Sequence, residues 1–263
     1  MKKHKIMITN DDGIQSVGLR AAVMAAKEFG DVIVVAPVTQ QTAMGRAYPR
    51  TENAGIIQKV DYAMKNIEAY AVNGSPGYCA AFGLMEIMET PPDLVISGIN
   101  FGCNMGLALT CSGTLGAAFE ASSEGVPVMA VSLETKAEDI MATSSVSVGF
   151  SKATEATKLW IGRVLEEVYE KKNEAYRFLN INIPAGDIDV KGYRMTFVEN
   201  QNYYVLRRPP ERDWSKPYCL SFSIDVDEEK LHRGSDIQTV CQDRLISVTP
   251  ITMDMTRNTL SRF

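Results

Sequence analysis

Two runs of mostly apolar residues near the N-terminus flank a segment with helical spacing. Residues 5–9 and 31–37 are apolar over most of their length, and residues 16–29 place apolar side chains on one helical face before Gly30. Strands that are apolar throughout are buried on both faces, as in parallel sheets covered by helices. The pattern therefore predicts a βαβ unit, the beginning of a doubly wound, mainly parallel, Rossmann-like α/β sheet.

The same alternation of strand and helix patterns continues to about residue 190. Strands are predicted at 55–60, 67–72, 93–98, 126–132 and 178–183, and helices at 76–88, 115–123 and 152–169. Pro76 opens its helix at the first turn, where proline is tolerated. Residues 1–190 are therefore expected to form one α/β core.

The pattern changes in residues 191–263. Alternating and aromatic stretches at 193–198, 203–206 and 218–224 are interrupted by the polar, proline-containing segment 207–212. This pattern is typical of β-hairpins. A hairpin arm is too thin to bury its own apolar side chains, so we expect the arm and C-terminal tail to pack on a partner subunit.

Composition narrows the possible functions. The 263 residues carry a net charge of −5 and no run of Lys or Arg, which disfavours binding to nucleic-acid polymers. There is no export signal and no apolar run of about 18 residues, so a cytoplasmic protein with no membrane span and five reduced cysteines is expected. The two histidines, His4 and His232, disfavour Ser-His or Cys-His catalysis and a His-rich zinc site. Hydrolysis would then depend on carboxylates and a hard cation.

Three polar loops follow predicted strands at residues 10–13, 38–46 and 99–114. Ligands of parallel α/β sheets bind beyond the carboxyl ends of the strands, where these loops should meet. Asp11 and Asp12 are adjacent acids that repel each other unless a cation or donors lie between them, and Mg²⁺ takes such oxygen ligands. The alternative is a simple turn or helix cap. No Lys or Arg precedes Arg20 in this stretch, which favours the metal.

The third loop offers groups for an anion. Its glycines allow close backbone approach, and Ser112-Gly113-Thr114 leads into a predicted helix whose free N–H groups attract negative charge. Ordinary helix capping by Ser or Thr is the alternative use. The chain has no GxxxxGK[ST] motif and no GxGxxG after the first strand, so a P-loop NTPase or a dinucleotide enzyme is unsupported.

Several segments in a fixed order resemble the SurE family of survival phosphatases, which act as 5′- and 3′-nucleotidases. The combination of NDDG, SGINxGxNxG and SGT is specific, and matches extend along the chain. The matching segments are residues 8–14, 34–37, 72–76, 92–100, 102–106, 112–118 and 247–250.

The resemblance implies a metal-dependent phosphatase of nucleoside monophosphates, and of short polyphosphate, whose core carries catalysis. It implies one Mg²⁺ or Mn²⁺ per subunit and a homodimer or homotetramer joined by the arm. Asp11 and Asp12 would be catalytic, acting through a bound water or a phospho-aspartate. The implied metal ligands are Asp11, Asp12, Asn100 and Thr42, the last in place of the family's serine five residues after Pro37. The implied phosphate contacts are Asn104, Ser112, Gly113 and Thr114.

The chain departs from the family pattern at three positions. Besides Thr42, Tyr78 stands where the family has Asp, and Cys111 where it has Tyr. These changes leave one alternative open, a non-catalytic nucleotide- or phosphate-binding regulator on the same fold. A third interpretation, a structural oligomerisation protein, does not explain why three polar loops meet at the carboxyl edge of the sheet.

Overall fold

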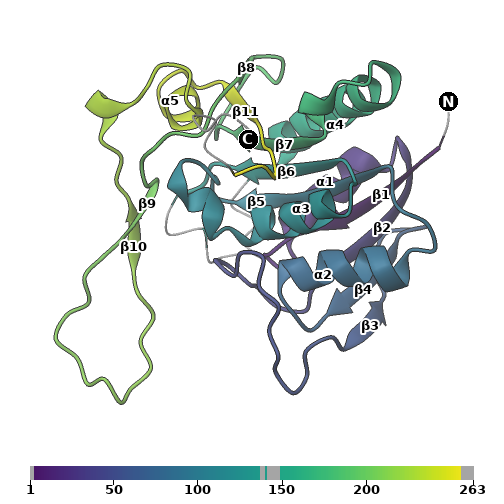
Figure 1. The fold of residues 1–263 in the computed structure, drawn as a ribbon, viewed down its shortest axis with the longest axis horizontal. Helices are drawn as coiled ribbons and strands as arrows, with labels where there is room; N and C mark the ends of the chain where they lie inside the picture. Colours follow the sequence, from purple (N-terminus) through teal and green to yellow (C-terminus); the bar gives the residue numbers. More distant parts are fainter. Residues whose placement is uncertain (1–2, 137–139, 141–148, 256–263) are drawn as a thin grey trace, which may run out of the picture.

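A computed structural model describes residues 3–136, 140 and 149–255. Its main sheet contains β1 (His4–Thr9), β2 (Gly30–Pro37), β3 (Ile57–Val60), β4 (Glu68–Val72), β5 (Leu94–Phe101), β6 (Val128–Leu133), β7 (Phe178–Ile183), β8 (Tyr193–Met195) and β11 (Ile246–Pro250). The strand order is β3-β4-β2-β1-β5-β6-β7-β11-β8 (Figure 1). The run from β4 to β7 is parallel, whereas β3 and β11 are antiparallel to their inner neighbours. The predicted mainly parallel, doubly wound sheet is confirmed.

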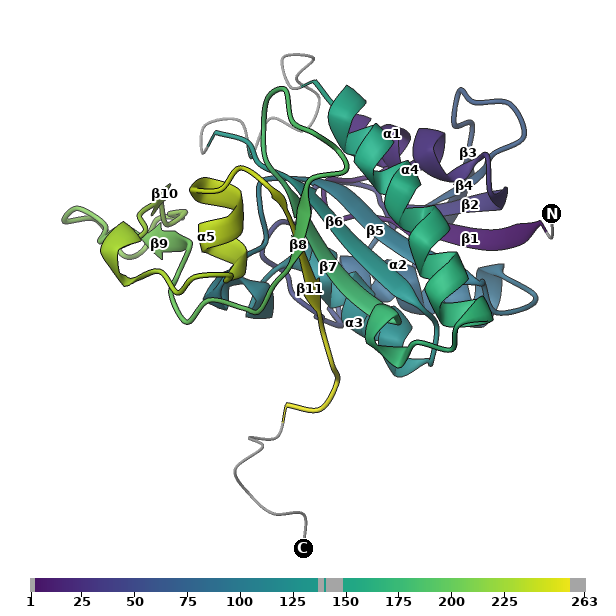
Figure 2. The same ribbon diagram turned by 90° about the horizontal axis from the view of Figure 1, so that it is seen from above.

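Helices cover both faces of this sheet (Figure 2). The helices α1 (Val17–Ala26) and α4 (Ser151–Leu165) pack on one face with Ile6, Ile8 and Trp160 in the core. The helices α2 (Pro76–Phe82) and α3 (Gly113–Ser123) cover the other face with Met7 and Leu115. Successive residues of β1 thus enter two different cores, which explains why its sequence shows no polar face.

Short helical segments complete the fold. They are η1 (Gly83–Ile87), η2 (Leu107–Thr110), η3 (Glu166–Glu170), η4 (Glu174–Tyr176), η5 (Glu228–Lys230) and the helix α5 (Asp236–Cys241). None of the helices in the described residues is long and apolar enough to cross a membrane.

Among the predicted boundaries that were wrong are those of the first helix and of the strand predicted at 93–98. Gly30 does not stop a helix but begins β2, where it pairs with His4 of β1. Glycine is needed there, because a Cβ would lie 1.9 Å from the His4 carbonyl oxygen. The first helix ends earlier, at Ala26. The strand β5 continues to Phe101 rather than ending at Gly98, since its pairing with β6 resumes at Asn100 after a register shift. Residues 99–101 are therefore strand, and the rest of the predicted loop contains η2 and the first two residues of α3.

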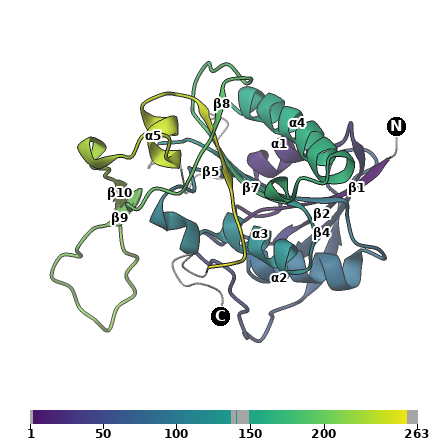
Figure 3. The same cartoon turned by 45° about the horizontal axis from the view of Figure 1, so that its top comes forward.

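The C-terminal part combines the predicted hairpin with two strands of the main sheet. The hairpin strands β9 (Tyr204–Leu206) and β10 (Phe222–Ile224) are antiparallel, and the segment between them projects from the body (Figures 1 and 3). The strands β8 and β11 extend the sheet beyond β7. The chain after residue 190 thus supplies sheet edge as well as arm, and the division at that residue stays a prediction.

Candidate metal and phosphate site

A tight turn after β1 presents two acids at the carboxyl edge of the sheet. The Asn10 side chain closes the turn by accepting from the Gly13 N–H at 3.2 Å and donating to the Gly13 carbonyl at 3.1 Å. Gly13 has a φ of +96°, which glycine adopts without strain. The Asx-type closure explains why this NDDG segment leaves the strand sharply, with Asp11 and Asp12 at the turn.

The two carboxylates are buried, and no Lys, Arg or His among the described residues forms an ion pair with either of them. Asp11 is 4% exposed and Asp12 5%. The Thr114 hydroxyl donates to Asp11 Oδ1 at 2.7 Å, and the Phe101 N–H donates to Asp12 Oδ2 at 3.3 Å. Burial raises the pKa of Asp11 to about 6, although the hydrogen bond from Thr114 lowers it. Burial, and next the charge of Asp11, raise the pKa of Asp12 well above its usual value. A bound cation would offset the free-energy cost of keeping both buried carboxylates charged.

The first turn of α3 lies directly against Asp11. Ser112 caps the helix by accepting from the Leu115 N–H at 3.1 Å. A Cβ on Gly113 would lie 2.7 Å from Asp11 Cβ and 2.9 Å from Asp11 Oδ2, so only glycine permits this approach. The first-turn N–H groups that lack intrahelical acceptors, and the helix dipole, therefore lie beside the acidic turn, an arrangement that favours a bound anion.

Asn104 is held rigidly by side chains from β6 and β7. Its N–H donates to Asn182 Oδ1 at 2.7 Å, and its amide donates to Ser132 Oγ at 2.9 Å. Asn180 donates to the Asn104 carbonyl at 2.8 Å. Sequence reasoning missed these supports. A signal was present, because residues 178–183 place two buried asparagines two apart, on one face of an otherwise apolar strand.

The two remaining implied metal ligands come from different loops. The Asn100 amide nitrogen donates to the Gly102 carbonyl at 2.8 Å, so the Asn100 Oδ1 is not used in this bond. Thr42 lies in the loop after β2, which is tied to the acidic turn because the Gln41 N–H donates to the Asp11 carbonyl at 2.7 Å. The three polar loops predicted to meet do so.

A cavity of about 540 Å³ joins most of these groups. Of the eight implied site residues, five line it: Asp11, Thr42, Asn100, Asn104 and Ser112. Asp12, Gly113 and Thr114 do not, and Thr114 is fully buried behind Asp11. The cavity is also lined by Tyr204 and Phe222 of the hairpin, which sequence reasoning did not include.

The donor chemistry fits a hard divalent cation. Two carboxylates, one amide oxygen and one hydroxyl form a mixed oxygen set of the kind that Mg²⁺ or Mn²⁺ accepts. Within the described residues, no group of three or more His, Cys, Asp or Glu side chains is arranged to hold a metal. A cysteine- or histidine-rich centre is thus unsupported there, and the neutral oxygens of Asn100 and Thr42 are needed to complete a site.

A doubly wound sheet with buried acids and a helix N-terminus at its carboxyl edge defines an α/β protein built to handle phosphate. Comparison with known proteins shows the family to which the chain belongs. The family model described as "Survival protein SurE" matches residues 6–205. The chain belongs to the SurE family.

Similar proteins cover nearly the whole chain. A protein named 5′-nucleotidase SurE from Methanocella arvoryzae is 38% identical, over 96% of this chain and 93% of its own length. Another of that name from Methanothermobacter thermautotrophicus is 43% identical, over 94% and 90%. The crystal structure of the SurE protein from Aquifex aeolicus matches with a TM-score of 0.75 and 28% identity, over 96% of this chain and 95% of that one.

Proposed function

We propose that this chain is a divalent-metal-dependent 5′-nucleotidase that hydrolyses nucleoside monophosphates to nucleoside and phosphate. The observation that carries the proposal is the pair of adjacent, buried carboxylates of Asp11 and Asp12, of which Asp11 lines the cavity and lies against the first turn of α3. The names of the relatives support the same activity. Extension to 3′-nucleotides and short polyphosphate belongs to the same proposal.

Four side chains would hold one Mg²⁺ or Mn²⁺ per subunit: Asp11, Asp12, Asn100 and Thr42. Such a cation supplies Lewis-acid polarisation of a phosphoryl oxygen and makes water more acidic. The chain itself keeps the ligands in place. Thr114 and the Phe101 N–H each occupy one carboxylate oxygen, which fixes the orientation of both acids.

The phosphate is proposed to lie between the acidic turn and α3. The Ser112 hydroxyl and the N–H groups of Gly113 and Thr114 would take up charge on the phosphoryl oxygens, with Asn104 as a further contact. These groups are preorganised, because Ser112 is fixed as the helix cap and Asn104 by Ser132 and β7. Asp11 would orient a water for attack or accept its proton.

Phosphate release from AMP, with and without Mn²⁺, tests the proposal. Wild-type protein should release phosphate only with the metal, and Asp11→Asn should abolish release while the melting temperature shows a folded protein. Asp187→Asn is the matched control, since Asp187 is 95% exposed and does not line the cavity. Binding of AMP without turnover in the wild type would contradict the proposal and identify a binding protein.

The arm is proposed to join subunits into a homodimer or homotetramer. Its support is the exposure of large apolar side chains on the hairpin and its loop, including Leu206 at 65% and Trp214 at 88%. Such side chains on a projecting segment are buried at low cost by a second copy. A cytoplasmic location remains part of the proposal and agrees with five free cysteines.

A further inference from the structure

The cavity has a polar part and an aromatic part. Its polar part consists of the side chains assigned above to metal and phosphate. The hairpin supplies the aromatic part, with Tyr204 from β9 and Phe222 from β10, and Val205 and Leu206 beside them. We call Tyr204 and Phe222 the hairpin wall. A ligand that fills the whole cavity is therefore charged on one side and flat or apolar on the other.

The rings of the hairpin wall pack against each other and against a buried neighbour. The rings of Tyr204 and Phe222 meet edge to face with centroids 5.4 Å apart, and the rings of Tyr203 and Tyr204 also meet edge to face, with centroids 4.8 Å apart. Tyr203 is 2% exposed and packs with Met105 and Ile237. Tyr204 also reaches the loop after Asn100, because a Cβ on Gly102 would lie 2.7 Å from its Oη. The ring therefore lies beside the proposed metal ligands and loses little freedom when a ligand binds.

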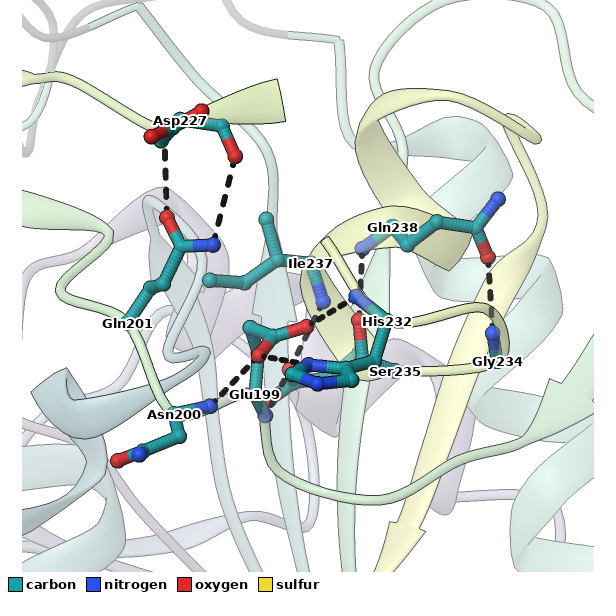
Figure 4. Close-up of polar contacts among 10 residues, drawn as sticks. Glu199, Asn200, Gln201, Asp227, His232, Gly234, Ser235, Ile237 and Gln238 are labelled. Carbon is teal, nitrogen blue, oxygen red and sulfur yellow. Dashed lines mark hydrogen bonds and ion pairs between the residues drawn. The ribbon is translucent and has the colours of Figure 1, made fainter. Parts of the chain in front are cut away.

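Hydrogen bonds at the base of the hairpin hold the wall next to the site. The Leu107 N–H donates to the Gln201 carbonyl at 2.9 Å. This bond joins the base of the hairpin to residues 102–112, which we call the site loop. The Gln201 side chain in turn bridges to the other strand: its amide donates to the Asp227 carbonyl at 3.3 Å and its Oε1 accepts from the Asp227 N–H at 3.2 Å (Figure 4). These bonds hold both ends of the hairpin in a fixed position next to the site loop.

A buried carboxylate strengthens the same junction. Asp236 is fully buried and accepts from the Gly106 N–H and the Glu199 N–H, each at 2.9 Å. Glu199 accepts from the His232 N–H at 2.8 Å and contacts the His232 ring at 2.9 Å, on the segment that precedes α5 (Figure 4). The site loop, the hairpin base and the α5 segment therefore form one hydrogen-bonded unit.

We propose that the hairpin wall receives the nucleobase, and that Tyr204 and Phe222 are specificity-determining residues which favour nucleotides over phosphate esters without a base. This inference rests on the proposed nucleotidase function. Every base has flat π faces, and contact with aromatic side chains is tolerant of base identity. The site thus selects for the presence of a base rather than for one base.

The test compares AMP with ribose 5-phosphate, which lacks the base, in phosphate-release assays with Mn²⁺. For Tyr204→Leu and Phe222→Leu we expect kcat/KM for AMP to fall about 5- to 140-fold, the range given by loss of one base–aromatic contact. The fall should lie mainly in KM, because the contact is present before and during the reaction. The loss for ribose 5-phosphate should be smaller, so the ratio of the two kcat/KM values should fall.

Two further variants keep the test decisive. Tyr204→Phe retains the ring and should retain the AMP preference even if Tyr204→Leu fails to fold. Tyr218→Leu alters an exposed ring that packs on Arg212 outside the cavity, and should leave both substrates unaffected.

The possible failures are distinguishable. Equal losses on AMP and ribose 5-phosphate, or an unchanged kcat/KM for AMP in both leucine variants, would overturn the hairpin-wall inference while leaving the nucleotidase proposal intact. A wild-type protein that releases phosphate from neither substrate would overturn both.

Discussion

Because Gly113 lies in close contact with Asp11, adding a single methyl group to Gly113 should destabilise the protein and lower its activity. In Gly113→Ala the new Cβ would lie 2.7 Å from Asp11 Cβ, an atom that cannot move without the backbone of the acidic turn. Either α3 or the turn must shift. We expect the overpacking to cost about 1–3 kcal/mol of unfolding free energy. For a chain of this size, this corresponds to a fall of about 2–10 °C in Tm. A shift of about 1 Å at the site should lower kcat/KM for AMP about 100-fold.

The matched control is Gly162→Ala, the same change in the interior of α4. There the nearest atom to a new Cβ is 3.5 Å away in the Phe29 ring, an ordinary contact. Alanine should stabilise this helix by about 0.5–1 kcal/mol and leave kcat/KM unchanged. The assays are thermal melting by circular dichroism and phosphate release from AMP. The reasoning is refuted if Gly113→Ala keeps the wild-type Tm and kcat/KM, or if the two alanine variants behave alike.

Two further predictions concern the supports of the site. Asn182→Ala removes the acceptor that lies 2.7 Å from the Asn104 backbone nitrogen. The unfolding free energy measured in urea titrations should fall by about 1–3 kcal/mol, and kcat/KM for AMP should fall as well. Unchanged activity would mean that Asn104 needs no support from β7. Burial raises the pKa of the Glu199 carboxyl, but hydrogen bonds to it outweigh burial, the largest of them from the His232 N–H. The pKa of Glu199 is therefore lower than its usual 4.5. The stabilisation by Glu199 is therefore present above pH 4.5 and lost as the pH falls through the lowered value. The Tm difference between wild type and Glu199→Gln should narrow in melts taken below that pH, whereas a constant difference would contradict the assignment.

Much of the architecture could be predicted because it depends on local patterns. Apolar runs without alternation indicated strands buried on both faces, and the segments between them carried helical spacing. The acidic turn was visible because Asn10, Asp11, Asp12 and Gly13 combine turn chemistry with adjacent charges. Their position at the carboxyl edge followed from the rule for parallel sheets, and the structure places them there.

The remaining features depend on contacts between distant segments. The extension of β5 past Gly98 depends on pairing with β6, which no pattern within residues 99–101 reveals. The bond from Gly106 to Asp236 spans 130 residues, and the one from Asn104 to Asn182 spans 78. The aromatic lining was missed for the same reason, because the hairpin is placed over the cavity by its base rather than by its own sequence.

Binding of Mn²⁺ to the purified chain, followed by electron paramagnetic resonance of the free ion, tests the central claim most directly. Wild type should bind one Mn²⁺ per chain, and Asp12→Asn should weaken binding at least about tenfold while remaining folded. Asp187→Asn should bind as wild type does. Equal Mn²⁺ affinity of wild type and Asp12→Asn would contradict a cation held between the two buried acids.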